Sequence, residues 1–180
     1  MIVLFNKPFN VLSQFTDNTK INVSRGNLSD YIDVPNIYPA GRLDKDSEGL
    51  LILTDQGKLQ QKISDPKYKM TKTYWVQIEG NITEDSLNNL RHGVQLKDGM
   101  TQNAIVKRIK QPHNLWLRKP PIRERKNIPD EWIKIIISEG KNRQIRRMTA
   151  AVGHPTLRLI RARIGDWHLN DLRNGSYKIL

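Results

Sequence analysis

The clearest regularity in the chain is a set of short apolar segments whose lengths are typical of β-strands. The run Leu50–Thr54 is uninterrupted, which indicates a strand buried on both faces. Lys72–Glu79 instead alternates polar positions with β-branched and aromatic residues. Further segments with strand character are Ile2–Phe5, Val11–Phe15, Gln102–Ile109, Trp132–Ser138 and Leu157–Ile164. Val11–Phe15 is a candidate partner of Ile2–Phe5, from which Lys7-Pro8 separates it.

Short helices are predicted where a capping residue precedes or follows a non-strand segment. The predicted helices run from Thr83 to Gly93, from an Asp55 cap through Ile63, and from about Arg143 to Gly153. Four prolines between residues 111 and 130 predict an extended basic excursion. Because strands and helices are intermixed and few helices are long enough to be crossovers, we predict the α+β class with a largely antiparallel sheet.

The charge of the chain is concentrated in its second half. The formal net charge is +12, yet residues 1–90 carry 10 basic and 11 acidic side chains, whereas residues 91–180 carry 20 and 7. Such an asymmetry indicates a polyanionic partner, most often nucleic acid and less often an anionic membrane surface.

Several classes of protein are excluded by what the sequence lacks. The absence of cysteine excludes a disulfide framework, a thiolate zinc site and a cysteine nucleophile. No apolar run approaches the roughly 18–20 residues that span a bilayer, and the N-terminus has no signal-peptide pattern. We therefore expect a cytoplasmic protein without membrane association.

An acidic loop, Gly41–Gly49, precedes the buried run Leu50–Thr54. Its carboxylates partly match a calcium-binding loop, but Pro39 stands where the entering helix should be, so we expect no metal site. Two interpretations remain: a solvated turn, or a functional carboxylate in a Gly-flanked loop of a cationic protein. The neighbouring Arg42 and Asp44 favour the second.

Three motifs in the chain identify a family. Residues 38–51, Tyr-Pro-Ala-Gly-Arg-Leu-Asp-Lys-Asp-Ser-Glu-Gly-Leu-Leu, closely resemble the catalytic-Asp motif of the RsuA-like branch of ribosomal RNA pseudouridine synthases. Lys72–Val76 resembles the family's Tyr motif, and Glu139–Met148 followed by Gly153-His154-Pro155 resembles its basic motif. The opening Phe5–Pro8 also fits, and the excursion at 120–126 most resembles members that act on 23S rRNA.

The resemblance implies a pseudouridine synthase fold: a mainly antiparallel mixed sheet with flanking helices, and two subdomains, 1–66 and 67–180, around an active-site cleft. Most members of the branch carry an N-terminal S4 RNA-binding domain, whereas the motifs here begin almost at Met1. We therefore expect no S4 domain and RNA binding by the chain's own surface. The implied reaction is an isomerisation that needs no cofactor and no metal.

The resemblance also assigns roles to individual residues. Asp44 attacks the nucleotide or promotes elimination at the ribose, and Arg146 keeps its carboxylate ionised. Tyr74 stacks on the uracil, Leu159 packs against the base, and Arg42 takes the place of the flipped base. From residue type alone, Tyr74 is more readily a core residue, and core packing is an equal possibility for Leu159. Residue type alone also favours a phosphate contact for Arg146, and the alternative for Arg42 is an ion pair with Asp44, Asp46 or Glu48 when RNA is absent.

Two basic stretches, Lys107–Lys126 and Lys141–Arg163, are the predicted RNA-binding surface. The candidate substrate-binding residues are Arg42, Leu43, Lys72, Lys107, Arg108, Lys110, Trp116, Arg123, Arg125, Lys126, Arg143, Arg147 and Leu159. The expected partner is large-subunit (23S) ribosomal RNA, and we expect a monomer. A catalytically silent rRNA-binding or assembly factor is the alternative, although a pure binder has no evident need for Asp44.

Overall fold

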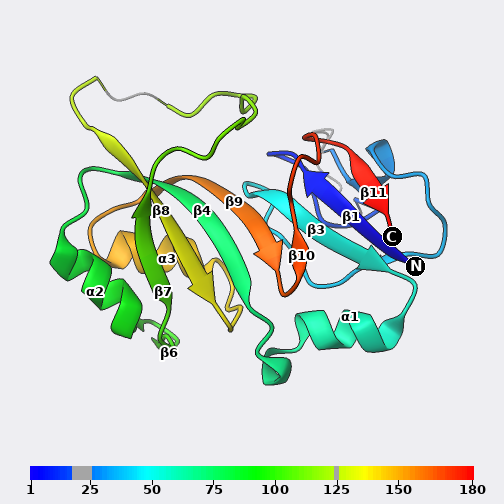
Figure 1. The fold of residues 1–180 in the computed structure, drawn as a ribbon, viewed down its shortest axis with the longest axis horizontal. Helices are drawn as coiled ribbons and strands as arrows, with labels where there is room; N and C mark the ends of the chain where they lie inside the picture. The colour runs from blue at the N-terminus through cyan, green and yellow to red at the C-terminus, as the bar shows by residue number, and fades with distance from the viewer. Residues whose placement is uncertain (18–25, 124–125) are drawn as a thin grey trace. The chain divides into compact units, whose positions relative to one another are not determined.

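The computed structural model describes residues 1–17, 26–123 and 126–180 and forms two compact units (Figure 1). Unit 1 comprises Met1–Met70 and Arg161–Leu180, and unit 2 comprises Thr71–Ile160. The C-terminal segment belongs to unit 1 because its last strand pairs with the first strand of the chain. The division at residue 66 that we predict from the sequence places residues 161–180 in the second subdomain instead. Pairing between the two ends of a chain has no local sequence signal, so the pattern along the chain does not reveal it.

Unit 1 is built on a sheet in the order β11-β1-β3-β9, with β2 beside β3 and β10 beside β9. The elements are β1 (Ile2–Lys7), β2 (Tyr38–Pro39), β3 (Glu48–Thr54), α1 (Gly57–Ser64), β9 (Thr156–Ile164), β10 (Trp167–His168), β11 (Tyr177–Ile179) and the 3-10 helices Leu28–Asp30 and Pro66–Tyr68. Strand β1 is antiparallel to both β3 and β11. Every residue of β3 is buried, which confirms the prediction for Leu50–Thr54.

Two predictions for unit 1 are wrong. Helix α1 begins at Gly57 with Gln56 as N-cap, because the Asp55 carboxylate instead pairs with the N-terminal ammonium at 2.8 Å. Residues 11–15 form no strand beside β1. Asn10 turns the chain with φ of 66°, and Val11 forms an isolated bridge to Gly26.

Unit 2 has the strand order β9-β4-β8-β7, and β9 begins in unit 2 and continues into unit 1 at Arg161. Its elements are β4 (Lys72–Glu79), α2 (Glu84–His92), β5 (Gln95–Leu96), β6 (Gly99–Met100), β7 (Ile105–Ile109), β8 (Asp130–Ile137) and α3 (Gln144–Ala151). Strand β8 is antiparallel to β4 on one side and to β7 on the other. One apolar cluster from these strands and both helices forms the core of the unit.

The local sequence signals of unit 2 are largely confirmed. Strand β4 has the predicted bounds, and α2 is capped by Thr83, whose Oγ1 accepts a hydrogen bond from the Ser86 amide at 3.1 Å. Strand β7 begins at Ile105, later than predicted. The described part of the excursion between β7 and β8 contains no helix or strand. The α+β class with antiparallel pairing is therefore correct.

The end of α2 gives a test of the fold. Gly93 has φ of 109°, and a Cβ there would lie 2.5 Å from the Thr101 carbonyl oxygen. We expect Gly93→Ala to lower the free energy of unfolding by about 2–4 kcal/mol, because backbone strain adds to a steric clash. Gly153→Ala is the matched control, with φ of 87° and no neighbour within 4 Å, and should cost about 1 kcal/mol. Denaturant titration measures both, and equal losses would contradict the role of the clash.

Candidate active site

Asp44 lies on the loop between β2 and β3, in unit 1. The residue before it, Leu43, is buried in the core of the unit. The Ser13 hydroxyl donates to the Leu43 carbonyl oxygen at 2.6 Å and accepts from the Leu43 amide at 3.2 Å. One side chain thus fixes both backbone polar groups next to Asp44, and the apolar Leu43 side chain anchors the same point.

The other side of the loop is held by Lys7, a fully buried cation at the end of β1. Its ammonium donates to the carbonyl oxygens of Val11 at 2.7 Å, Pro8 at 2.8 Å and Lys45 at 3.3 Å. The Asn10 amide also donates to the Lys45 carbonyl, at 2.8 Å. The chain that follows β1 and the chain that follows Asp44 therefore share one buried centre of hydrogen bonding.

Burial makes the charged form of the Lys7 side chain unfavourable. Burial lowers the pKa of Lys7 from 10.5 to about 7, while the carboxylates of Glu48, Asp46 and Asp44 raise it and the guanidinium of Arg161 lowers it. Glu48 itself is buried. A compact set of charged groups therefore underlies the loop that carries Asp44.

Arg161 of β9 also holds this loop, although it is only 3% exposed. Its Nε donates to the Leu50 carbonyl at 2.8 Å and its Nη1 to the Arg42 carbonyl at 3.3 Å. Sequence reasoning did not single out Ser13, Lys7 or Arg161 as site residues. A charged residue inside an apolar strand pattern is the signal that could have found Arg161.

The Arg42 side chain is exposed and extends from the loop. Its Nη2 donates to the Gln14 side-chain oxygen at 3.2 Å. The ion pairs found in the described part of the chain do not include Arg42. The contact described for the Arg42 side chain is therefore the one with Gln14.

Tyr74 and Leu159 both belong to the core cluster of unit 2. Tyr74 lies on β4 opposite Ile135 of β8 and is 8% exposed. Leu159 lies on β9 and is 4% exposed. Lys72 is half-buried at the start of β4. The structure therefore brings the predicted aromatic and apolar residues into one cluster.

The basic motif forms the start of α3 in unit 2. Arg143 is exposed and occupies the N-cap in a left-handed conformation, while Arg146 and Arg147 are half-buried on the helix. The turn before α3 is fixed by Gln144, whose Oε1 accepts from the Lys141 amide at 3.0 Å and whose Nε2 donates to buried Glu139 at 2.6 Å. Gln144 and Glu139 thus position the arginines, a role that sequence reasoning missed.

Two of the predicted RNA-binding arginines pair with carboxylates of unit 2. Arg147 pairs with Asp98 at 2.7 Å, and its hydrogen bonds lower the pKa of that carboxyl. Arg108 pairs with Glu84 at 2.8 Å, and hydrogen bonds from Arg91 and then Arg108 lower the pKa of Glu84. A phosphate group would have to compete with these carboxylates.

The remaining RNA candidates differ in accessibility. Trp116 is half-buried, and the Arg158 guanidinium lies over its ring, 5.6 Å from the centroid, so one face of the indole is covered. The exposed candidates on β7 and the excursion are Lys107, Lys110, Arg123 and Lys126. Arg125 lies outside the described residues.

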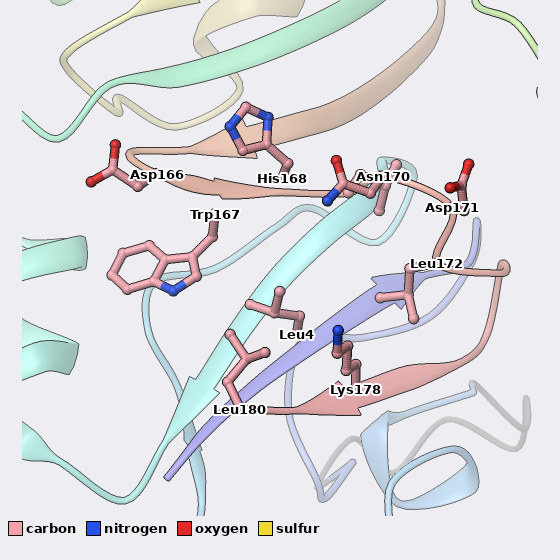
Figure 2. A pocket seen from close by; sticks show the side chains of 10 residues that line it. Leu4, Asp166, Trp167, His168, Asn170, Asp171, Leu172, Lys178 and Leu180 are labelled. Atoms are coloured by element: carbon pink, nitrogen blue, oxygen red, sulfur yellow. The ribbon is translucent and has the colours of Figure 1, made fainter.

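A separate pocket of about 550 Å³ opens in unit 1 between β1, β10 and the C-terminal segment (Figure 2). Leu4, Leu172 and Leu180 form apolar walls, and Trp167, His168 and Lys178 also line it. None of its lining residues belongs to the predicted site.

Comparison with known proteins defines the class of this protein. A family model described as RNA pseudouridylate synthase matches residues 1–151. The chain belongs to the RNA pseudouridylate synthase family and is an isomerase. A solved structure described as "Crystal structure of pseudouridylate synthase" aligns with 99% of this chain and 69% of its own, with a TM-score of 0.78 and 28% identity, which confirms the predicted fold.

Closer relatives narrow the family to one type. A protein of Vibrio parahaemolyticus named Ribosomal large subunit pseudouridine synthase E is 54% identical over 98% of this chain and 72% of its own length. A protein of the same name from Xanthomonas axonopodis pv. citri is 52% identical over 96% and 90%. These identities confirm the branch that the motifs indicate.

Among the described residues, no helix has the length and apolar character that crossing a bilayer requires.

The buried ammonium predicts a pH dependence of stability. Unfolded Lys7 stays protonated up to about pH 10.5, whereas folded Lys7 loses its proton near pH 7, so the unfolded chain binds more protons in between. The contribution of Lys7 to the free energy of unfolding is therefore largest above pH 10.5 and is lost as the pH falls to 7. We expect the free energy of unfolding to rise by on the order of 1 kcal/mol per unit above pH 7, relative to Lys7→Met.

Urea titrations of both proteins between pH 6 and pH 9 measure this difference. Since Lys7→Met also loses hydrogen bonds, the comparison concerns the slopes with pH and not the absolute stabilities. Parallel curves for the two proteins would contradict the assignment.

Proposed function

We propose that this enzyme converts a specific uridine of large-subunit (23S) ribosomal RNA to pseudouridine, with Asp44 acting on an extruded nucleotide. The observation that carries the proposal is the loop of Asp44, whose backbone is held by Ser13, Lys7 and Arg161. Catalysis depends on holding reactive groups in one geometry, which such a loop provides. The names of relatives 50–54% identical support the choice of large-subunit rRNA.

In the proposed reaction the C1′–N1 glycosidic bond breaks, the uracil turns, and C5 bonds to C1′. The C5 proton is lost and N1 gains a proton, so atoms and charge balance without an oxidant, a reductant or an energy source. Asp44 acts at the ribose or at the base, Tyr74 and Leu159 contact the uracil, and Arg146 keeps the Asp44 carboxylate ionised. A cation is needed because exclusion of water would otherwise favour the neutral acid.

Arg42 is the proposed wedge that fills the space left by the flipped base. Its exposed side chain, bound to Gln14 and outside the ion pairs described above, supports this role. Arg143 and the exposed cations of β7 and the excursion are the proposed phosphate contacts. Because Arg108 and Arg147 pair with carboxylates, we assign them a smaller share of RNA binding.

The decisive substitution is Asp44→Asn, which keeps the size of the side chain and removes its charge. We expect no pseudouridine, because an amide neither attacks nor stabilises the ribose, while RNA affinity stays within a few-fold. Asp46→Asn on the same loop is the matched control and should retain activity. Nucleotide-resolution pseudouridine mapping of 23S rRNA incubated with each protein is the measurement.

Activity retained by Asp44→Asn would reject Asp44 as the catalytic carboxylate. If the wild-type chain binds rRNA but forms no pseudouridine in it, the protein is instead a silent rRNA-binding factor.

A second test separates exposed cations from paired ones. We expect the double substitution Lys107→Gln, Lys110→Gln to reduce the slope of log binding constant against log salt by about 1.4, since each phosphate contact to a single strand contributes about 0.7. Arg108→Gln lies on the same strand but removes a cation paired with Glu84, so the slope should stay near that of the wild type. Filter binding to 23S rRNA across salt concentrations measures both. An unchanged slope in the double variant would place the RNA elsewhere, whereas an equal reduction in Arg108→Gln would reject the effect of its ion pair.

A further inference from the structure

Arg161 joins the two ends of the segment that carries Asp44. The Nε and Nη1 atoms of one guanidinium bind the carbonyl oxygens of Leu50 and Arg42, at 2.8 and 3.3 Å. Leu50 lies in β3, and Arg42 lies two residues before Asp44. The guanidinium is planar and rigid, so it fixes both the position and the relative orientation of the two carbonyls.

A gain in the stability of the folded protein does not explain well why Arg161 is buried. Its Nη2 is buried and forms no hydrogen bond with any residue that the structure describes. Its charge also repels that of Lys7, whose pKa it lowers. An apolar side chain would avoid both penalties, since buried charges often contribute less to stability than apolar residues of similar size. The geometry that Arg161 imposes on the loop is the better explanation.

Three carbonyls in the middle of the loop are held by other donors. Ser13 binds the carbonyl of Leu43, the Ser47 amide binds that of Asp44 at 3.0 Å, and Lys7 binds that of Lys45. These contacts fix the middle of the segment, whereas Arg161 ties its beginning to its end. A shift of about 1 Å in a reacting group can reduce a rate about 100-fold, so this tie bears directly on catalysis.

We propose that Arg161 is a positioning residue for Asp44: by holding the Arg42 and Leu50 carbonyls together, it keeps the Arg42–Leu50 loop in the one conformation in which Asp44 reacts. The inference rests on the proposed role of Asp44. It predicts that loss of the contact with both carbonyls lowers the rate at which bound substrate reacts and leaves substrate affinity nearly unchanged.

The test compares Arg161→Lys, which keeps the charge but not the fork, with Arg161→Met, which removes both. We expect kcat for pseudouridine formation to fall about 10–100-fold in each, with KM within about threefold of the wild type. Arg173→Lys is the matched control, because Arg173 belongs to the same unit but is exposed and lies outside both predicted RNA-binding stretches. The control should retain the kcat of the wild type.

Hydrogen–deuterium exchange of peptides covering residues 42–50 gives a readout that does not depend on activity. We expect faster exchange in both Arg161 variants and unchanged exchange in Arg173→Lys. Thermal unfolding checks that each variant is folded. Arg161→Met, which removes the buried charge, keeps the test available if Arg161→Lys does not fold.

Three results would overturn the inference: a wild-type kcat in Arg161→Lys, a loss confined to KM, or unchanged exchange of the loop. A wild-type chain inactive on 23S rRNA would instead reject the proposed function. Exchange would still report in that case whether Arg161 holds the loop.

Discussion

The backbone of residues 42–50 forms no regular structure until β3 begins, so its carbonyl groups must find donors elsewhere. Unpaired backbone groups in a buried position are costly, and side chains from three distant segments meet this requirement. Ser13, Lys7 and Arg161 supply the donors. The sheet of unit 1 brings the last two together, because β1 and β9 flank β3. The conformation of the loop that carries Asp44 therefore depends on the sheet order.

In unit 2, hydrogen bonds from a side chain likewise hold the backbone that carries the basic motif. The turn before α3 is held by the Gln144 amide, which bonds to the Lys141 backbone and to buried Glu139, while the apolar face of the helix packs in the core. Arginines placed on such a helix have restricted positions even before RNA is bound. Such preorganised side chains are a common contribution of a protein to catalysis, because reacting groups must be held in one geometry.

The net charge of +12 overstates the cations available to RNA. Arg108 and Arg147 pair with carboxylates, Arg158 covers one face of Trp116, and Arg161 is buried against backbone carbonyls. A count of basic residues therefore predicts which half of the chain binds RNA but does not rank the residues of that half. The exposure of each basic side chain and its pairing within the protein rank these residues, because a cation that already has a partner gains less binding energy from a phosphate.

The sequence by itself determined the elements with strong local signals, such as β3, β4 and the Thr83-capped α2, and its motifs identified the family and predicted Asp44 as the catalytic carboxylate. Apolar periodicity and caps act over a few residues, so they can be read along the chain. Only the tertiary structure decided which side chains hold the loop that carries Asp44 and which arginines are paired. Arg161 and Leu50 are 111 residues apart, and such a hydrogen bond depends on strand order, which no local pattern encodes.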